Sequence, residues 1–380
     1  MTEIVKWSAV ETAESIRNRT VGVAEVVSAH LKRLDAVNLQ INAITEVDPD
    51  CLDLAHALDA KRPSGDLPPL FGVPVTTKIN VDQAGYSNSN GIPAFAENIC
   101  DQDSAVVANL KIAGAIVIGR TNTPEFSMRW CTSNPLYGVT KNPWNNAITP
   151  GGSSGGAAAA VASGIGTIAH GNDLGGSLRY PAFSCGVTAI RPSLGRVPAY
   201  NPSAKVERPP VTQLMSEQGP IARSVAELRL GLQVMSKGSS HDPLWTAAPN
   251  SGRSREGKIK IGFCANPFSA PIDPAQEQAM QTACDALRAA GHEAVECIPP
   301  QADHAARLWG ELLFTETLLL MGDTIREFGS SEMNRLLEGY RDIFGSRDLA
   351  GFMQGLSERR ALQRAWSTMF DGIDLLLMPT

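Results

Sequence analysis

The fold is decided by Pro150-Gly-Gly-Ser-Ser-Gly-Gly156, a glycine-serine turn that runs directly into the alanine-rich segment Ala157-Ala-Ala-Ala160. Flexible glycines open a predicted helix here, so its N-terminal amides would point at whatever lies in the turn. Such a turn is an anion-binding arrangement, although a plain helix start with serine caps is the alternative. The G-x-S-x-G pattern of a nucleophile elbow is also present, but Pro150 stands where the preceding strand should be.

A second glycine pair follows in Gly171-Asn-Asp-Leu-Gly-Gly-Ser-Leu-Arg-Tyr-Pro181 and delivers Ser177 at the start of another predicted helix. If Ser177 attacks a carbonyl carbon, nearby backbone N–H groups can form an oxyanion hole, because glycine permits the close approach that aims them inward. Asp173 and Arg179 flank this turn, and both a structural ion pair and a catalytic role are open for them. The candidate oxyanion-hole amides are those of Leu174, Gly175, Gly176 and Ser177.

A serine nucleophile needs a base, and two candidates are present. His170 is the histidine nearest to the glycine turns, but a lone histidine in an apolar strand is more often a core residue. Lys78 follows an otherwise uncharged strand in Pro74-Val-Thr-Thr-Lys78. A lysine buried among hydroxyl groups loses its proton readily, because desolvation disfavours the ammonium, and the neutral amine can then act as a base.

The segments around the two turns alternate between strand-like and helix-like patterns, which is typical of an α/β fold with helices packed on a buried sheet. Neither an internal repeat nor a linker long enough to force a domain boundary interrupts this alternation. The predicted strands are 71–76, 115–119, 167–169 and 187–190, and the predicted helices are 104–113, 157–162 and 224–235.

Residues 1–60 and 258–380 extend this pattern on both sides. The first part opens with Ser8-Ala-Val-Glu11, a capping-box pattern, and its apolar spacing predicts a helical surface layer. Residues 201–219 and 239–257 are rich in Pro, Ser, Gly and Arg, and they are predicted to form long surface loops. In the C-terminal part, strands are predicted at 258–263, at 293–298 and, as a buried strand, at 374–380, and helices at 274–290 and over most of 305–370.

Composition excludes several classes of protein. The chain has 380 residues, 43% hydrophobic and 19% charged, which rules out intrinsic disorder. The net charge is 33 − 39 = −6 with scattered charges, so we expect neither nucleic acid nor a membrane as partner. No apolar run of about 18 residues or leader pattern is present, and the seven cysteines form no disulfide or zinc pattern. A cytoplasmic protein with reduced thiols is expected.

Lys78, the two glycine turns and Arg191-Pro-Ser-Leu-Gly-Arg-Val197 resemble, in order and in spacing, the amidase signature family. The resemblance extends to residues 119–127, 141–144 and 219–225 and is densest at 70–225. It implies one α/β domain over residues 1–380, with a mixed central β-sheet flanked by helices on both faces. Residues 70–225 would be its core, 1–60 its N-terminal helical layer and 258–380 its C-terminal α/β portion.

The resemblance also implies a mechanism, which is hydrolysis of a carboxamide through a Ser-cisSer-Lys triad without cofactor or metal. Ser177 would be the nucleophile, Ser153 the bridging serine on a cis peptide and Lys78 the base. Asp173, Arg179 and Ser154 would support them. A small-molecule amide is then the expected partner, and a homodimer is allowed.

By analogy with the family, the acyl pocket is expected to be lined by part of the 126–134 stretch, with loops 201–219 as a lid. Aromatic and sulfur side chains there favour an apolar or aryl acyl group, although ordinary core packing explains them equally well. The candidate lining residues are Phe126, Met128, Trp130, Cys131, Asn134 and Trp144.

The sequence departs from the family pattern without removing a triad residue. Many members carry Asp-Asn after the lysine, where this chain has Ile79-Asn80, and Gly-Thr-Asp before the glycine pair, where it has Gly171-Asn-Asp173. The usual Gly-x-Lys-Pro becomes Ala189-Ile-Arg-Pro192. Catalysis is therefore expected to survive, while substrate preference is left open. Members also usually continue for tens of residues beyond the Leu-Leu-Met-Pro segment before Thr380, so a truncated C-terminal part is expected.

Two other functions stay open. The chain could be the glutaminase subunit of a tRNA-dependent amidotransferase, which needs partner chains. Two observations argue against this function. The stretch Pro198-Ala-Tyr-Asn-Pro-Ser-Ala-Lys205 diverges from those subunits, and no basic tRNA-binding surface is evident in the sequence. It could also be a catalytically inactive relative that binds an anion with the same glycine turns. Intact Lys78, Ser153 and Ser177 argue against that alternative.

Overall fold

The structure is a computed structural model of the chain, and it describes residues 3–62, 65–249, 257–268 and 270–380. The chain divides into two compact units. The first is formed by Met1–Asn250 with Phe328–Ser330, and the second by Ser251–Glu327 with Ser331–Thr380. The first unit contains both glycine turns, and the second begins close to the predicted C-terminal portion. The assignment of both units to one domain stays a prediction.

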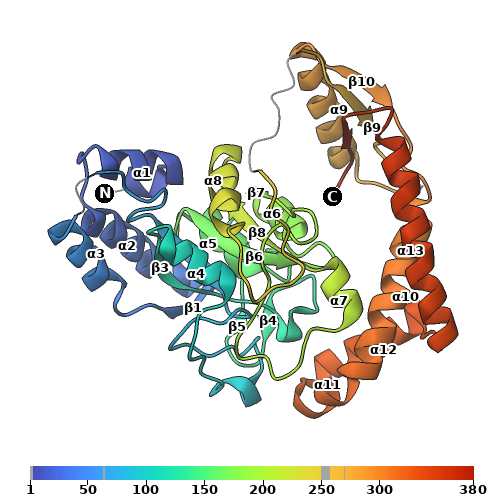
Figure 1. The fold of residues 1–380 in the computed structure, drawn as a ribbon, viewed down its shortest axis with the longest axis horizontal. Coiled ribbons are helices and arrows are strands. Elements are labelled where there is room, and N and C mark those ends of the chain that lie inside the picture. Colours follow the sequence, from blue (N-terminus) through green and yellow to red (C-terminus); the bar gives the residue numbers. More distant parts are fainter. Residues whose placement is uncertain (1–2, 63–64, 250–256, 269) are drawn as a thin grey trace. The chain divides into compact units, whose positions relative to one another are not determined.

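A mixed β-sheet forms the centre of the first unit (Figure 1). In spatial order its strands are β1 (Ile44–Val47), β3 (Ile116–Thr121), β2 (Pro74–Lys78), β6 (Ile168–Asp173), β8 (Glu217–Ala222) and β7 (Thr188–Ala189). β2 pairs in parallel with β3 and β6. The other pairs, β1 with β3, β6 with β8 and β7 with β8, are antiparallel. The predicted α/β class with a mixed central sheet is confirmed.

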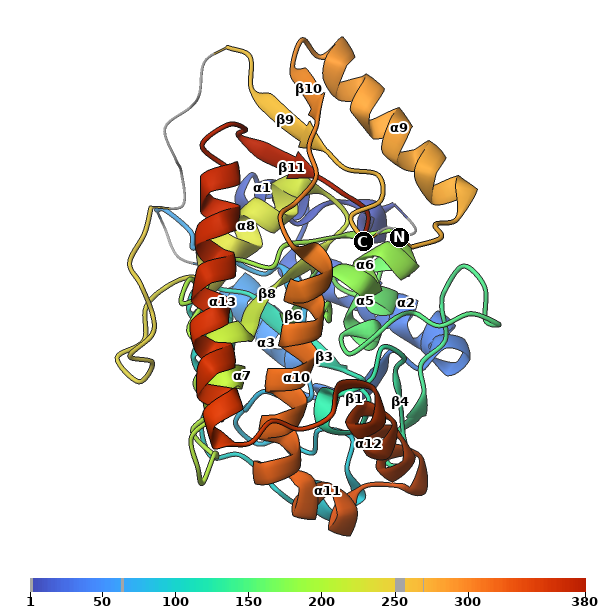
Figure 2. The same ribbon diagram turned by 90° about the vertical axis from the view of Figure 1, so that its right-hand side faces the viewer.

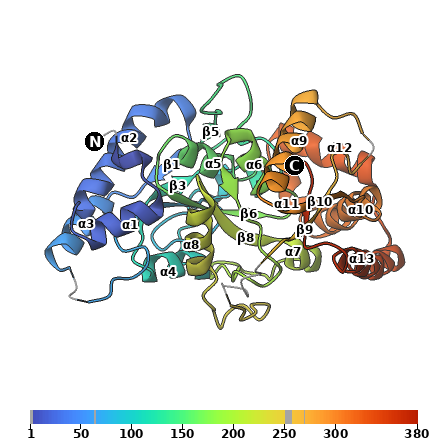
Figure 3. The same ribbon diagram turned by 90° about the horizontal axis from the view of Figure 1, so that it is seen from above.

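Helices cover both faces of this sheet, because successive residues of a strand point to opposite sides. On β3, Ile116 and Ile118 pack into one buried cluster, whereas Val117 packs into another. The first cluster includes residues of α2 (Val23–Ile41) and α5 (Gly155–Ala162), and the second includes residues of α4 (Ala105–Ile112) and α8 (Val225–Met235). Figure 3 shows α5 on one side of β6 and β8, and α8 on the other. The prediction of helices on both faces is confirmed.

The N-terminal helices contribute to this core. α1 (Ala9–Arg17) begins with the predicted capping box, in which the Ser8 hydroxyl accepts from the Glu11 amide and the Glu11 carboxylate accepts from the Ser8 amide. On α2, Val23 is fully buried in the cluster that also contains Ile116 and Ile118 of β3, and α3 (Cys51–Ala60) packs on α2. The predicted surface layer is therefore partly core.

The predicted loop at 201–219 is wrong in part. It contains α7 (Pro210–Met215) and the first residues of β8. Pro210 can open α7 because an N–H at that position would have no partner within the helix. Residues 239–249, the described part of the other predicted loop before residue 257, form neither helix nor strand. The remaining short elements of this unit are η1 (Ile4–Lys6), η2 (Pro93–Phe95), η3 (Glu125–Ser127), β4 (Ser133–Asn134), β5 (Gly138–Val139) and α6 (Arg179–Cys185).

The second unit combines a small parallel sheet with a group of helices (Figure 2). Its sheet has the order β10 (Glu293–Glu296), β9 (Lys260–Phe263), β11 (Leu375–Leu377). β11 is not the buried strand that the sequence predicts, because it lies at the edge and Leu375 is 52% exposed. The helices of this unit are α9 (Pro274–Ala289), α10 (Ala302–Leu320), α11 (Gly322–Phe328), α12 (Ser331–Phe344) and α13 (Leu349–Met369).

Among the described residues of both units, none of the helices combines the length and the apolar composition that a membrane span requires.

Candidate active site

Lys78 is the last residue of β2, and its side chain is fully buried. Its amine Nζ lies 2.7 Å from Ser153 Oγ, 3.2 Å from Ser154 Oγ and 2.8 Å from Asn172 Oδ1. The strand extends through the lysine rather than ending before it, because β2 stays paired with β3 as far as Lys78. The structure thus brings the predicted base together with both serines of the first glycine turn.

Burial is the main cause that lowers the pKa of Lys78 well below its ordinary value. A fully buried ammonium loses its hydration, so the neutral amine is favoured. The negative charge of Asp173 opposes this shift, but Arg179 and Arg191 lie 2.9 Å and 3.7 Å from that carboxylate and compete for it. A neutral lysine amine can accept a proton from a hydroxyl group.

The first glycine turn holds its serines on backbone that glycine makes possible. Gly151 has φ +81°, and the peptide bond between Gly152 and Ser153 is cis, as the family resemblance implies. A Cβ at Gly152 would collide with the carbonyl oxygen of Arg129. Ser154 is the N-cap residue of α5, but its side chain makes no capping hydrogen bond to the helix. The hydroxyls of Ser153 and Ser154 lie by Lys78 instead. The serine-cap interpretation of this turn is therefore wrong.

The second glycine turn places Ser177 next to the first. The Ser154 amide donates to the Ser177 carbonyl oxygen at 3.3 Å, and the Ser177 side chain is 9% exposed. Within the described ranges, the Ser177 hydroxyl has no hydrogen-bond partner. It is therefore not committed to a structural role. A hydrogen bond from Ser177 Oγ to Ser153 Oγ, on which the predicted proton relay depends, stays a prediction.

The amides predicted to bind an oxyanion are not equivalent. Gly176 has φ +107°, and its N–H donates to Asp173 Oδ1 at 2.8 Å. This amide is occupied and is not available for an oxyanion in this conformation. The N–H groups of Gly175 and Ser177 have no acceptor among the described residues. Gly175 and Ser177, with Leu174 beside them, are therefore the remaining candidates for the amides of the predicted oxyanion hole.

Asp173 organises the second turn through its buried carboxylate. Its oxygens accept from the amides of Gly176 and Leu178 and from the guanidinium of Arg179. Burial alone would raise the pKa of Asp173, but the hydrogen bonds and charge of Arg179, together with the two amides, hold it below the usual value. Of the two roles that the sequence leaves open for this pair, the structure shows the ion pair.

The candidate pocket residues separate into different environments. Trp130 is 49% exposed, and its indole N–H donates to the Gly175 carbonyl oxygen at 2.9 Å, so it lies against the second turn. Asn134 is buried, and its amide is committed to Asn122, Thr123 and Tyr137. Phe126 is buried, Cys131 is exposed, and Trp144 donates to the carbonyl oxygen of Cys185. A lining role for Phe126, Met128, Trp130, Cys131, Asn134 and Trp144 stays a prediction.

His170 is not placed as a base. It is fully buried on β6, its Nε2 lies 2.7 Å from Gln218 Oε1, and burial lowers its pKa to about 4. Its Nδ1 accepts a long, 3.5 Å bond from the Lys78 amide. No hydrogen bond joins His170 to Ser177 in the described part of the chain.

Sequence reasoning missed a group of amides beside the lysine. Asn172 Nδ2 donates to Asn80 Oδ1 at 2.9 Å, and Asn80 Nδ2 donates to Ser127 Oγ at 2.9 Å. Thr123 Oγ1 lies 3.1 Å from Ser127 Oγ and donates to the Ser153 carbonyl oxygen. The only signal in the sequence was that Asn172 and Ile79-Asn80 depart from the family pattern.

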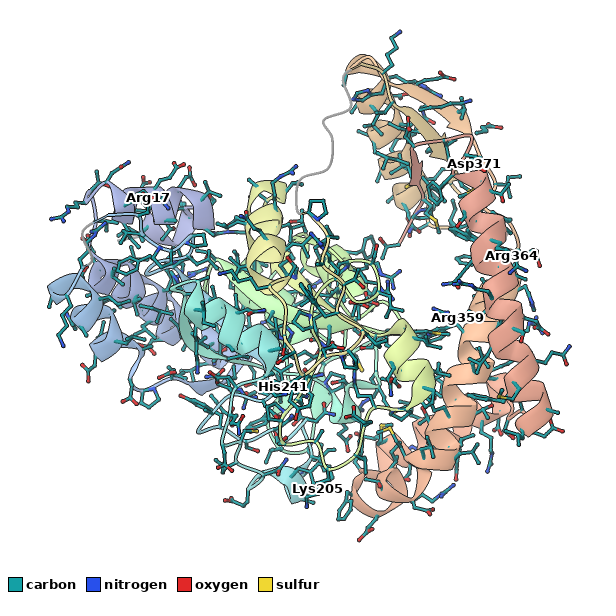
Figure 4. The ribbon with its side chains drawn as sticks, in the orientation of Figure 1. Arg17, Lys205, His241, Arg359, Arg364 and Asp371 are labelled. Carbon is teal, nitrogen blue, oxygen red and sulfur yellow. The ribbon has the colours of Figure 1, made fainter. Side chains whose placement is uncertain are left out.

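A further contact fixes the segment that the sequence predicts as part of a lid. Asp82 is fully buried and accepts from the amide and hydroxyl of Ser203 at 2.6 Å and 2.9 Å. The ring of Tyr200 stacks on His241, with centroids 5.2 Å apart; His241 is labelled in Figure 4. The segment around residues 200–203 is therefore held in place, and a lid role for 201–219 stays a prediction.

Known proteins resemble this chain over most of its length. Residues 25–380 match the sequence model of the family described as Amidase. An indoleacetamide hydrolase of Bradyrhizobium diazoefficiens is 45% identical over 377 residues, which cover 99% of this chain and 72% of that relative. A glutamyl-tRNA(Gln) amidotransferase subunit of Geobacter sulfurreducens is 34% identical, with 99% of this chain and 82% of the relative covered.

A solved structure of a fatty acid amide hydrolase is similar over the whole chain. The TM-score is 0.86, and the match covers 100% of this chain and 68% of the other. The identity is 22%, so this likeness bears on the fold alone.

Proposed function

The chain belongs to the amidase family and is an amide-hydrolysing enzyme, and we propose that Ser177, Ser153 and Lys78 are its catalytic triad. The observation that carries the proposal is the 2.7 Å distance between Lys78 Nζ and Ser153 Oγ. It supports a proton path because the lysine is fully buried and its pKa is lowered by that burial. The proximity of the two turns, joined by the Ser154 amide and the Ser177 carbonyl, supports Ser177 as the nucleophile.

In the proposed acylation, the neutral Lys78 amine takes the proton of Ser153 while Ser153 takes that of Ser177. Ser177 Oγ bonds to the amide carbon, and the carbonyl oxygen becomes an oxyanion held by the Gly175 and Ser177 amides. Ser153 then passes a proton to the leaving nitrogen and is reprotonated by Lys78. The C–N bond breaks, leaving an acyl-enzyme and ammonia or an amine.

Deacylation repeats these steps with water. A water molecule gives its proton to Ser153, which passes one to Lys78, and the hydroxide bonds to the acyl carbon. Collapse of the second oxyanion breaks the ester bond, and the proton returns through Ser153 to Ser177. The products are the free carboxylic acid and the starting enzyme.

We further propose that the substrate is a small amide with an aryl acyl group. The indoleacetamide hydrolase at 45% identity supports this class, since its name assigns that relative an arylacetamide. The half-exposed indole of Trp130 against the Gly175 carbonyl supports it too, because an aromatic face near the nucleophile can stack on an aryl ring. The glutaminase alternative has weaker support, since its relative is 34% identical.

The test is ammonia release from indoleacetamide, phenylacetamide, acetamide and glutamine, measured for the wild-type chain, Ser177→Ala and Ser153→Ala. We expect release from the aryl amides that both substitutions abolish while unfolding midpoints stay close to wild type. Release that persists in Ser177→Ala would contradict the triad. Glutamine as the preferred substrate would favour the amidotransferase function, and no release from any amide would favour an inactive anion-binding relative.

A further inference from the structure

Asn172 lies beside Lys78 and is held in one orientation. Its Nδ2 donates to Asn80 Oδ1 at 2.9 Å, and its Oδ1 accepts from Lys78 Nζ at 2.8 Å and from Asn80 Nδ2 at 3.3 Å. The opposite orientation of the amide would turn its oxygen toward Asn80 Oδ1 and its Nδ2 toward Asn80 Nδ2, so that acceptor would face acceptor and donor would face donor. Asn80 is in turn held by the Ser127 hydroxyl. The oxygen of Asn172 is therefore the atom offered to Lys78.

The number of donors and lone pairs on a neutral lysine amine determines the effect of the Asn172–Lys78 hydrogen bond. A neutral lysine has two N–H donors and one lone pair, and three oxygen atoms surround Nζ. Asn172 Oδ1 can only accept, so it takes one N–H. The Ser154 hydroxyl donates to the Asn172 carbonyl oxygen at 3.3 Å, so its oxygen is free to accept the second N–H. The lone pair is left for Ser153 Oγ at 2.7 Å.

Resting on the proposed triad, we propose that Asn172 is a positioning residue that, with Ser154, occupies both N–H groups of Lys78 and directs its lone pair at Ser153. An uncharged amide is suited to this role, because it accepts a hydrogen bond without the full negative charge that would stabilise the ammonium. A carboxylate at this place would hold the same N–H but would favour the protonated, inactive base. The asparagine thus orients the lysine and leaves it neutral.

The other groups around Lys78 do not supply this function. Asp173 acts on the lysine by charge, but its oxygens are used by backbone amides and by Arg179. Among the described residues, His170 accepts a bond from the Lys78 amide and burial lowers its pKa to about 4. Arg120 acts by charge on His170 and pairs with Glu46 at 2.9 Å, and Arg191 lies 3.7 Å from Asp173.

Two substitutions at Asn172 separate orientation from charge. Asn172→Asp keeps an oxygen acceptor and adds a charge; we expect the acid limb of kcat/KM to move up by about one pH unit or more, with kcat at high pH within about threefold of wild type. Asn172→Leu fills the space but removes the acceptor. We expect its kcat to fall about 10- to 100-fold at every pH, with KM changed less than about threefold, because a misdirected base affects the proton transfer and not binding.

Asn109→Leu is the matched control. Asn109 is also buried, but its amide donates to the carbonyl oxygens of Met235 and Lys237 and makes no contact with Lys78. We expect this variant to keep the wild-type pH profile even if its unfolding midpoint falls. A shift in the acid limb that also appears in Asn109→Leu would overturn the proposal, because the effect would then be general loosening of the fold.

A measurement that does not depend on turnover distinguishes this proposal from the proposed function. The 13Cε chemical shift of Lys78, assigned by its loss in Lys78→Met, reports the protonation of the amine in the folded chain. We expect the titration midpoint of Lys78 to rise in Asn172→Asp and to stay at the wild-type value in Asn109→Leu. Equal midpoints in wild type and Asn172→Asp would overturn the proposal. A raised midpoint in a chain that hydrolyses no amide would support the contact while contradicting the proposed triad chemistry.

Discussion

The amine of Lys78 and the hydroxyl of Ser153 lie 2.7 Å apart although 75 residues separate them in the chain. Strand pairing explains the meeting, since β2 carries the lysine beside β6, and the two glycine turns flank β6 in the sequence. The alanine-rich α5 then packs with fully buried Ala157 and Ala158 against the same sheet face. Lys78 and Ser153 are thus held in place by strand pairing and core packing.

Replacing Lys78 by methionine removes the amine while filling similar buried space. We expect kcat to fall about 10²- to 10⁴-fold, the usual contribution of a general base, without loss of folding at neutral pH. Steady-state kinetics on an arylacetamide and a thermal unfolding curve measure both. Lys111→Met is the control, because Lys111 is a surface lysine paired with Asp103; it should keep wild-type kinetics. A Lys78→Met enzyme with more than a tenth of wild-type kcat would rule out Lys78 as the base.

The same lysine should make folding stability depend on pH in a defined direction. Its pKa in the folded chain is lowered from 10.5, the value expected in the unfolded chain. Between these two pKa values the unfolded chain binds a proton that the folded chain does not. The free energy of unfolding therefore rises as pH rises through this window, by up to about 1.4 kcal/mol per pH unit, and falls as pH falls toward the folded pKa.

Lys78→Met lacks this titration, so the difference in free energy of unfolding between wild type and Lys78→Met isolates it. We expect that difference to increase in favour of wild type as pH rises toward 10.5. Urea unfolding of both chains at several pH values measures it. A difference that does not change with pH would mean that the buried lysine keeps its charge in the folded chain.

Position 152 has room only for glycine, because the backbone of residues 129–131 lies close to it. A Cβ there would lie 2.8 Å from the Cys131 amide nitrogen and would also collide with the Arg129 carbonyl oxygen. Gly152→Ala should therefore cost about 1–3 kcal/mol of stability and lower kcat by about 10²-fold, because Ser153 would be displaced from Lys78. In contrast, Gly339 on α12 has open space at its Cβ position, and Gly339→Ala should stabilise by about 0.5–1 kcal/mol. Equal effects of the two substitutions would contradict this account.

Local sequence signals were sufficient to find the elements and the triad candidates. The Ser8 capping box, the alternation of strands and helices and the two glycine turns predicted the α/β sheet and the places of Ser153 and Ser177, because each depends on neighbours close in sequence. The resemblance selected Lys78 over His170 as the base and added the cis peptide, which spacing alone does not reveal. The pairing of β2 with β6 brings Lys78 close to the two glycine turns.

Contacts between distant polar side chains could not be predicted in the same way. The Asn172–Asn80 pair links residues 92 positions apart, and Asp82 reaches Ser203 over 121 positions. Nothing local distinguishes such asparagines and aspartates from solvated ones. The helix α7 escapes prediction for a different, local reason. The prolines of 201–219 indicate a loop, whereas Pro210 stands at the start of α7, where proline is tolerated.

Asp82 should control how firmly the segment around Ser203 is held. Asp82→Ala would leave the Ser203 amide and the Asn88 side chain without their acceptor, at a cost of about 1–3 kcal/mol. Because Asn201 in the same segment donates to the Asn80 carbonyl oxygen, we expect KM for the amide to rise more than kcat falls. The exposed Asp101→Ala is the control. A fall in kcat with unchanged KM would show that the segment acts on the chemistry and not on binding.

Trp130 offers a direct test of the aryl substrate class. Its half-exposed ring is held against the second turn by the indole N–H bond to the Gly175 carbonyl oxygen. Trp130→Ala removes ring and bond, so kcat/KM for phenylacetamide should fall at least about tenfold more than kcat/KM for acetamide, the discrimination expected from one apolar contact surface. Trp130→Phe keeps a ring but loses the bond, and it should lower both values together by about 2- to 10-fold. If Trp130→Ala lowers both substrates equally, the indole only supports the glycine turn, and the aryl preference must come from other residues.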